Sequence, residues 1–118
     1  MIRTEQLAEA ALAGDALELR SMAQDWLREN ACIANSASPA SIDRTVLAVA
    51  AGLVELFAER RGESPPAWTS AIGGVASPIY LVKSAHQMRR LRQLCDTESP
   101  APLRRRNLFA PPTFLEFA

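Results

Sequence analysis

The 118-residue chain is 48% hydrophobic and 22% charged, and its thirteen Lys and Arg residues balance thirteen Asp and Glu residues. This length corresponds to one domain, and the composition is that of a packed globular protein, which excludes a chain disordered throughout. Zero net charge argues against a general polyanion-binding protein. The charges are unevenly distributed, however: residues 1–82 carry six basic against ten acidic residues, and residues 83–118 carry seven against three. This asymmetry indicates either an interaction surface or a basic segment that folds onto an acidic body.

We expect a soluble, cytoplasmic protein without a membrane partner. The longest apolar segment, residues 45–58, falls short of the roughly 20 residues that span a bilayer. The first residues place acids where a signal peptide needs an apolar stretch. Cys32 and Cys95 lie far apart and outside any metal-ligand spacing, which is typical of free thiols in a reducing compartment.

Residues 5–30 are predicted to form an antiparallel αα-hairpin. Thr4 is a typical N-cap, and Gly14 supplies the left-handed conformation that ends a helix. Asp15 is the expected cap of the second helix, with Glu18 three residues later as in a capping box. The apolar stripe of that helix comprises Leu19, Met22, Ala23, Trp26 and Leu27.

Residues 42–61 are predicted to form the central helix, entered from Pro39 or Ser41 and terminated by Gly62. Little of this segment looks solvated before Glu55, so it should be buried. Its large apolar face comprises Val46, Val49, Ala50, Leu53, Leu56 and Phe57. Small residues on the other side allow a neighbour to approach closely; these are Ala48, Ala51 and Gly52.

The second half of the chain is less regular. Residues 79–82 have the composition of a strand, but no second strand is evident, so an extended or short helical segment is expected. Ser84 and Gln87 have capping-box spacing, which predicts a basic amphipathic helix over residues 84–95.

Residues 99–118 are predicted to form a C-terminal arm that begins with a proline-marked helix start. Together the elements predict an all-α fold in a single domain, residues 1–118. The expected architecture is a small orthogonal bundle of about four main helices with an extended C-terminal segment.

The sequence has no recognisable catalytic or metal-binding constellation. His86 is the only histidine, so no His–metal site or Ser-His-Asp arrangement can be assembled from it. Gly73-Gly74 lacks the Lys-Ser/Thr that follows in a phosphate loop. We therefore expect a binding protein, not an enzyme, with no metal and no cofactor.

The C-terminal arm is the candidate partner-binding site. Large apolar side chains this close to a terminus are expected to dock on the body, on a partner or on another copy. The candidate residues are Arg104, Arg105, Arg106, Leu108, Phe109, Phe114 and Phe117. In one interpretation the arginines face an acidic partner and the apolar residues form the buried centre of the contact. In the other the segment is a clamp, in which the arginines bridge helix ends while Leu108 and Phe109 fill the core.

Two further hypotheses remain. In a DNA- or RNA-binding regulator, Arg89, Arg90, Arg92 and the arginines at 104–106 would contact phosphates. The neutral chain and the acidic second helix argue against it. In a plain homo-oligomer, the apolar tail would exchange between copies.

Two segments carry a resemblance to a family. Pro66-Ala67-Trp68-Thr69 and the later run Ser99-Pro100-Ala101-Pro102-Leu103-Arg104-Arg105-Arg106-Asn107-Leu108-Phe109 resemble a pattern in small bacterial proteins. The resemblance covers about residues 65–118. Such proteins are similar to members of two-gene modules whose other product looks like a nucleotidyltransferase-fold toxin. This implies an antitoxin-like role in a toxin–antitoxin system. The chain departs from the pattern in two places. Leu103 stands where an aromatic residue is common, and the segment between Trp68 and Ser99 lacks the Pro- and Trp-rich pattern often seen there.

Overall fold

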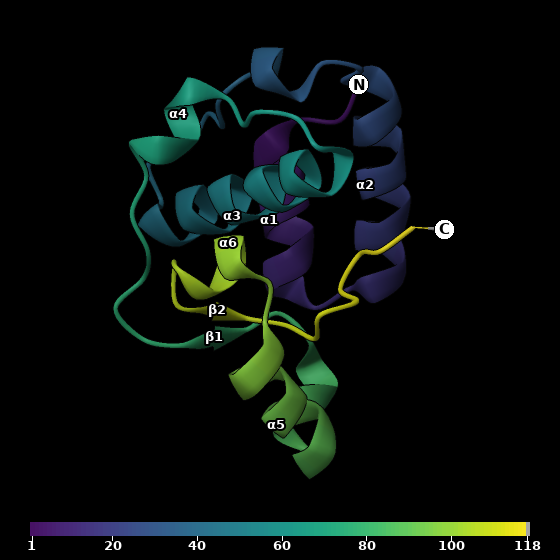
Figure 1. The fold of residues 1–118 in the computed structure, drawn as a ribbon, viewed down its shortest axis with the longest axis vertical. Coiled ribbons are helices and arrows are strands. Elements are labelled where there is room, and N and C mark those ends of the chain that lie inside the picture. Colours follow the sequence, from purple (N-terminus) through teal and green to yellow (C-terminus); the bar gives the residue numbers. More distant parts are fainter. Residues whose placement is uncertain (118) are drawn as a thin grey trace.

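The computed structural model describes residues 1–117, which are mainly helical (Figure 1). Helices α1 (Thr4–Ala13) and α2 (Ala16–Glu29) run in opposite directions, and α3 (Arg44–Arg61) crosses them steeply (Figure 1). The shorter elements are η1 (Ile33–Asn35), α4 (Ala67–Ser70), β1 (Ile79–Tyr80), η2 (Lys83–His86), α5 (Arg89–Glu98), α6 (Ala101–Arg104) and β2 (Leu108–Phe109). The predicted all-α class is confirmed, apart from one small sheet formed by β1 and β2.

The αα-hairpin is present as predicted. Gly14 ends α1 with a φ of 74°, and the Asp15 carboxylate accepts a hydrogen bond from the Glu18 backbone N–H at 3.0 Å. The expected role of Thr4 is wrong. Its hydroxyl donates instead to the Ala37 carbonyl at 2.9 Å, so it fixes the loop before α3 and does not cap α1.

Helix α3 is buried at the centre of the core, as its composition predicts. Asp43, rather than Pro39 or Ser41, caps it, because the Asp43 carboxylate accepts from the Thr45 backbone N–H at 2.8 Å. Gly62 ends it with a φ of 69°. Buried side chains occur all round this helix and include both the large apolar face and the small residues Ala48, Ala51 and Gly52.

The small residues of α3 admit the C-terminal segment. A methyl group placed at Gly52 would lie 3.0 Å from Leu103 Cδ2 and 3.3 Å from Leu108 Cδ1. Both leucines are fully buried. The close approach of α6 and β2 to α3 therefore depends on the missing side chain at position 52.

The expectation that residues 79–82 lack a partner strand is wrong. Ile79 pairs with Leu108 and Tyr80 with Phe109 in a parallel arrangement. Backbone hydrogen bonds from Ile79 to Asn107 at 3.1 Å and from Leu81 to Phe109 at 2.9 Å hold the two strands together. A two-residue strand shows no periodicity, so only the folded chain reveals this pairing.

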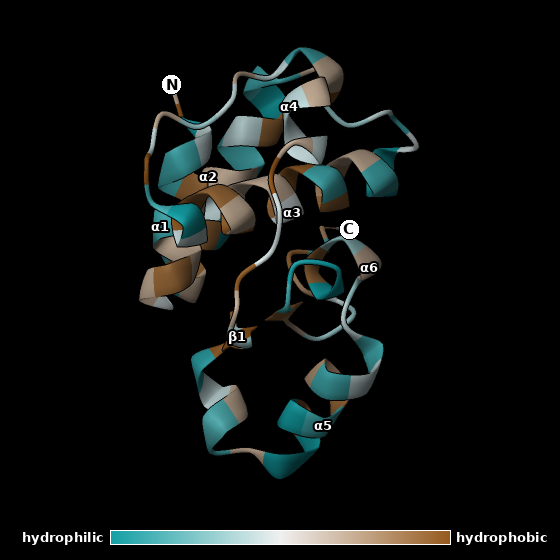
Figure 2. Ribbon diagram, turned by 90° about the vertical axis from the view of Figure 1, so that its left-hand side faces the viewer, coloured by the Kyte–Doolittle hydropathy of each residue, from teal (hydrophilic) through white to brown (hydrophobic). Residues whose placement is uncertain are grey.

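The predicted helix at residues 84–95 is also corrected. The Ser84 carbonyl accepts from the backbone N–H groups of Gln87 and Met88, which closes the short turn η2. Met88 then adopts an extended conformation (φ −111°, ψ 103°), and α5 starts after it without a side-chain cap. We call residues 83–98 the α5 arm, which projects from the body along its long axis (Figures 1 and 2).

Replacement of Gly52 tests the contact between α3 and the C-terminal segment. We expect Gly52→Val to lower the free energy of unfolding by about 1–3 kcal/mol, because overpacking forces Leu103 and Leu108 to move. Gly73→Val is the matched control, since a Cβ added there meets nothing within 4 Å. Urea unfolding of both variants checks the prediction, which equal stabilities would contradict.

Candidate functional site

Arg106 lies inside the protein, not on its surface. Its side chain is 7% exposed and forms an ion pair with Glu55 of α3, whose side chain is 11% exposed. Arg106 Nη1 donates to Glu55 Oε1, and Nη2 donates to Glu55 Oε2 at 3.1 Å. Nη2 also donates to the Thr69 carbonyl of α4 at 2.8 Å. The side chain therefore joins the middle of α3 to α4 and the turn after α6, an internal contact as in the clamp interpretation, although it does not bridge helix ends as that interpretation expected.

The pair changes the protonation chemistry of Glu55. Burial alone would raise the pKa of the Glu55 carboxyl, but the hydrogen bond and charge of Arg106 lower it, with a further contribution from Arg105. The net effect is a pKa below the ordinary glutamate value. Glu55 is thus held as a carboxylate and the ion pair persists at neutral pH.

Arg106 brings together the two segments that carry the family resemblance. Thr69 belongs to the Pro66-Ala67-Trp68-Thr69 segment and is buried, and its carbonyl accepts from Arg106. Asn107 follows with a φ of 64°, and its side-chain amide donates to the Val75 carbonyl at 3.2 Å. The motif residues at these positions thus build one internal contact.

The neighbouring motif residues divide between interior and surface. Arg104 is exposed and donates to the Thr97 carbonyl near the end of α5. Arg105 is exposed, with Nη2 3.3 Å from Glu55 Oε1. Leu108 is fully buried, whereas Phe109 is half-buried and stacks on Tyr80 with ring centroids 5.4 Å apart.

The last predicted aromatics lie half-buried on the body. Phe117 packs against the core near α2, and the Arg20 guanidinium lies 5.1 Å from the centre of its ring. Phe114 also packs against the core and lines an open groove of about 440 Å³. The tail therefore docks on its own chain, but part of its apolar surface stays accessible.

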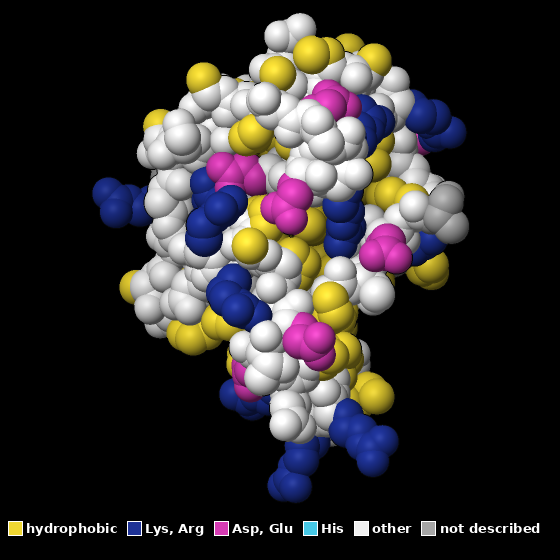
Figure 3. Space-filling view, viewed as in Figure 1, with side chains coloured by type: hydrophobic (Ala, Val, Ile, Leu, Met, Phe, Trp, Pro, Cys, Tyr) yellow, Lys and Arg dark blue, Asp and Glu magenta, His cyan; other side chains and the backbone are white. Residues whose placement is uncertain are grey.

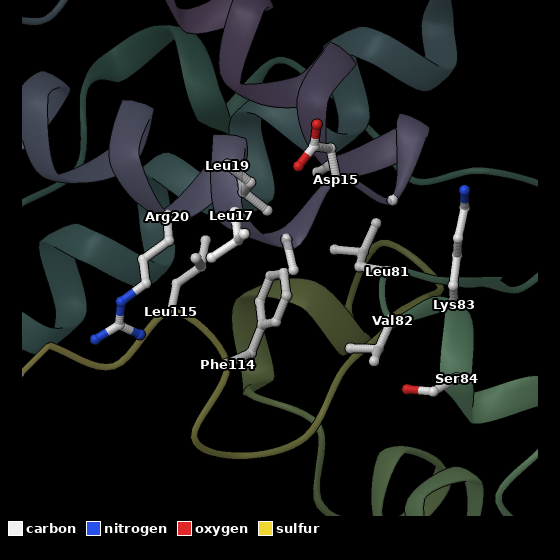
Figure 4. A pocket seen from close by; sticks show the side chains of 13 residues that line it. Asp15, Leu17, Leu19, Arg20, Leu81, Val82, Lys83, Ser84, Phe114 and Leu115 are labelled. Atoms are coloured by element: carbon white, nitrogen blue, oxygen red, sulfur yellow. The ribbon is translucent and has the colours of Figure 1, made fainter.

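The groove lies between the start of α2, the segment after β1 and the C-terminal tail. Figure 4 shows Phe114 pointing between the α2 side chains and the pair Leu81 and Val82. Leu17 of α2 is 84% exposed at this groove. Polar rim residues are Asp15, Arg20, Lys83 and Ser84. An apolar centre with a charged rim is the usual composition of a protein interface.

The predicted nucleic-acid residues lie apart from the clamp. Arg89, Arg90 and Arg92 are all exposed on the α5 arm. Dark-blue Lys and Arg side chains stand at the tip of this arm in Figure 3. The structure thus separates the two arginine groups that the sequence places close together.

Sequence reasoning missed several residues of this region. Glu55 and Thr69 accept hydrogen bonds from Arg106, and Leu17 and Lys83 line the groove. Two of these gave a signal: Glu55 interrupts the longest apolar run, and Leu17 is apolar but stands outside the helical stripe of α2. Thr69 stood out only as part of the Pro66-Ala67-Trp68-Thr69 segment and Lys83 not at all, because their contacts join segments distant in the sequence.

The remaining candidate groups are the single histidine and the two cysteines. His86 is exposed and lies edge-on to Tyr80, with ring centroids 5.8 Å apart. Burial raises the pKa of the Cys95 thiol, and Cys32 is exposed. Within residues 1–117, no group of three or more His, Cys, Asp or Glu side chains is arranged to hold a metal ion.

Comparison with protein-family models, with curated proteins and with solved structures gave no match for this chain. No helix within the described part, residues 1–117, is both long and apolar enough to cross a bilayer.

Removal of the Glu55 charge tests the clamp. We expect Glu55→Gln to lower the free energy of unfolding by about 3–5 kcal/mol, because Arg106 is left buried without a counter-charge. Glu59→Gln on the same helix is the control, since Glu59 is exposed, and we expect it to have little effect. Chemical unfolding at neutral pH measures both. Similar losses in the two variants would contradict the clamp.

The pH dependence of stability provides a second test of this pair. Because the folded pKa of Glu55 is lowered, its stabilising contribution is present above the unfolded glutamate pKa of about 4.3 and is lost as pH falls through the folded value. Between neutral pH and about pH 3, the native protein should therefore lose more stability than Glu55→Gln. Thermal unfolding across this range measures the difference, and parallel curves would refute it.

Proposed function

We propose that this chain is a non-enzymatic interaction module that binds and restrains a cognate enzyme in the bacterial cytoplasm. The family resemblance supplies the class of partner, a nucleotidyltransferase-fold toxin from the same two-gene module. In this proposal the chain is the antitoxin-like member. Its binding surface combines the accessible part of the C-terminal tail with the groove beside it.

The observation that carries the proposal is the exposed apolar surface at the groove. Leu17 is 84% exposed next to the half-buried Phe114. Burial of one leucine side chain contributes about 1.5–3 kcal/mol, so a partner that covers Leu17 gains substantial affinity. The surrounding charged groups Asp15 and Lys83 supply the polar rim that sets orientation.

The C-terminal tail has some residues buried in its own chain and others accessible, which supports the proposed binding surface. Arg106 and Leu108 are used inside the chain and hold the tail in place. Phe114 is left partly accessible to a partner, and Arg104 and Arg105 keep exposed side chains although each also contacts its own chain. A pre-positioned tail loses less conformational entropy on binding than a free one, which favours affinity.

The test is a direct affinity measurement with the enzyme of the same two-gene module. We expect Leu17→Asp to weaken binding at least about tenfold, because each 1.4 kcal/mol of lost contact energy corresponds to a factor of ten. Ile42→Asp is the matched control: it makes the same kind of exchange at a fully exposed apolar residue outside the groove. Isothermal titration calorimetry gives both dissociation constants.

Leu17 is suited to this test because a side chain this exposed contributes little to the packing of the fold. Equal thermal stability of the two variants verifies that point. Unchanged affinity of Leu17→Asp would overturn the assignment of the groove. Failure of the two native proteins to associate at micromolar concentration would overturn the proposed function.

A further inference from the structure

The α5 arm carries a concentrated positive charge. Four Lys and Arg residues and no Asp or Glu occur between residues 83 and 95. These four residues, Lys83, Arg89, Arg90 and Arg92, are exposed. Within residues 1–117, neither Arg89 nor Arg90 forms an ion pair or a side-chain hydrogen bond. The charge on the arm is therefore not neutralised by the acidic body.

The positions of these arginines do not serve the stability of α5. Arg89, Arg90 and Arg92 lie in and just after its first turn, where the helix dipole already presents positive charge. No side chain caps this end of the helix. Repulsion among these three positive side chains lowers the stability of the helix further. Helix stability alone would favour acidic residues here, so the cations need another explanation.

Arg92 is held in a defined orientation. Its guanidinium carbon lies 5.1 Å from the centre of the Tyr80 ring, and Tyr80 also stacks on Phe109. The Tyr80 hydroxyl donates to the carboxylate of Asp96 in α5. A guanidinium ordered in this way loses little freedom when it binds a ligand. Guanidinium planes can stack on unpaired bases where proteins bind single strands.

The arm lacks the apolar centre that a protein partner would need. Most of α5 has the colour of hydrophilic residues in Figure 2, and Met88, which is 55% exposed, is the large exposed apolar residue of the arm. Arginine also occurs in protein interfaces, but there it accompanies large apolar and aromatic residues, whereas an arginine surface with little apolar area suits phosphates. The charge complementarity of the arm thus favours a phosphate backbone over an acidic protein.

We propose that the α5 arm binds the phosphodiester backbone of a nucleic acid, with Arg89, Arg90 and Arg92 as phosphate contacts and Lys83 as an additional cation. Arg104 to Arg106 are not part of this site, because Arg106 and Arg105 face Glu55 and Arg104 binds the Thr97 carbonyl. Lys83 also lines the groove around Leu17, but Arg89, Arg90 and Arg92 lie outside that groove. The inference does not rest on the proposed restraint of an enzyme.

Fluorescence anisotropy of the full chain tests the site with labelled single-stranded DNA, single-stranded RNA and duplex DNA. Four phosphate contacts predict a slope of log affinity against log salt of about −2.8 for single strands and about −3.6 for duplex DNA. The double variant Arg89→Gln/Arg90→Gln should weaken binding at least about tenfold at low salt and halve the slope. The three probes identify which form of nucleic acid binds best.

Two variants with the same change of charge serve as controls. Arg28→Gln/Arg44→Gln alters exposed arginines of the body and should leave affinity nearly unchanged. If this variant lost as much affinity as Arg89→Gln/Arg90→Gln, the weaker binding would be an effect of net charge alone, and the proposed site would be overturned. An equal loss in Arg104→Gln/Arg105→Gln would transfer binding to the C-terminal arginines and also overturn the assignment.

Two further controls test whether the variant stays folded and whether the ligand is a nucleic acid. The Arg89→Gln/Arg90→Gln variant should be at least as stable as the native protein, because it removes positive charge from the positive end of a helix. Poly-L-glutamate that binds as tightly as the nucleic acids would identify an acidic polypeptide as the ligand and overturn the proposal. So would the absence of binding to every nucleic-acid probe at low salt.

Discussion

The ion pair between Glu55 and Arg106 links the middle of the central helix to the end of the chain. Glu55 is the one acid within the apolar body of α3, and Arg106 meets it from the turn after α6. Each group alone would be costly to bury, so the two stabilise the fold only together. The Thr69 carbonyl completes the contact and ties α4 to the same point.

Several features of the tail follow from this contact. The Arg106 carbonyl accepts from the Val75 backbone N–H at 3.1 Å, and Asn107 turns the chain through a left-handed conformation. Leu108 then enters the core and pairs with Ile79. The position of Phe114 at the groove depends on this sequence of contacts. The accessible apolar surface thus lies on a tail that is held in place by the buried contacts of Arg106 and Leu108.

The segment after β1 connects the two surfaces for which functions are proposed. Tyr80 orders Arg92 of the α5 arm, and the next residues, Leu81 and Val82, line the groove. The apolar groove suits a protein partner because it offers buried area, whereas the arm offers charge without such area. The two surfaces differ in chemistry although they share one short stretch of backbone.

The sequence by itself determined the helical body. Gly14, Asp15 and Gly62 act locally, and the apolar run of α3 requires burial wherever it lies, so hairpin and central helix could be predicted. It also indicated the C-terminal arm as the region of interest. Only the tertiary structure decided which arginine is internal, because Glu55 and Arg106 are far apart in the chain. The pairing of β1 with β2 and the groove at Leu17 are likewise made by contacts between distant segments, which periodicity and capping signals do not encode.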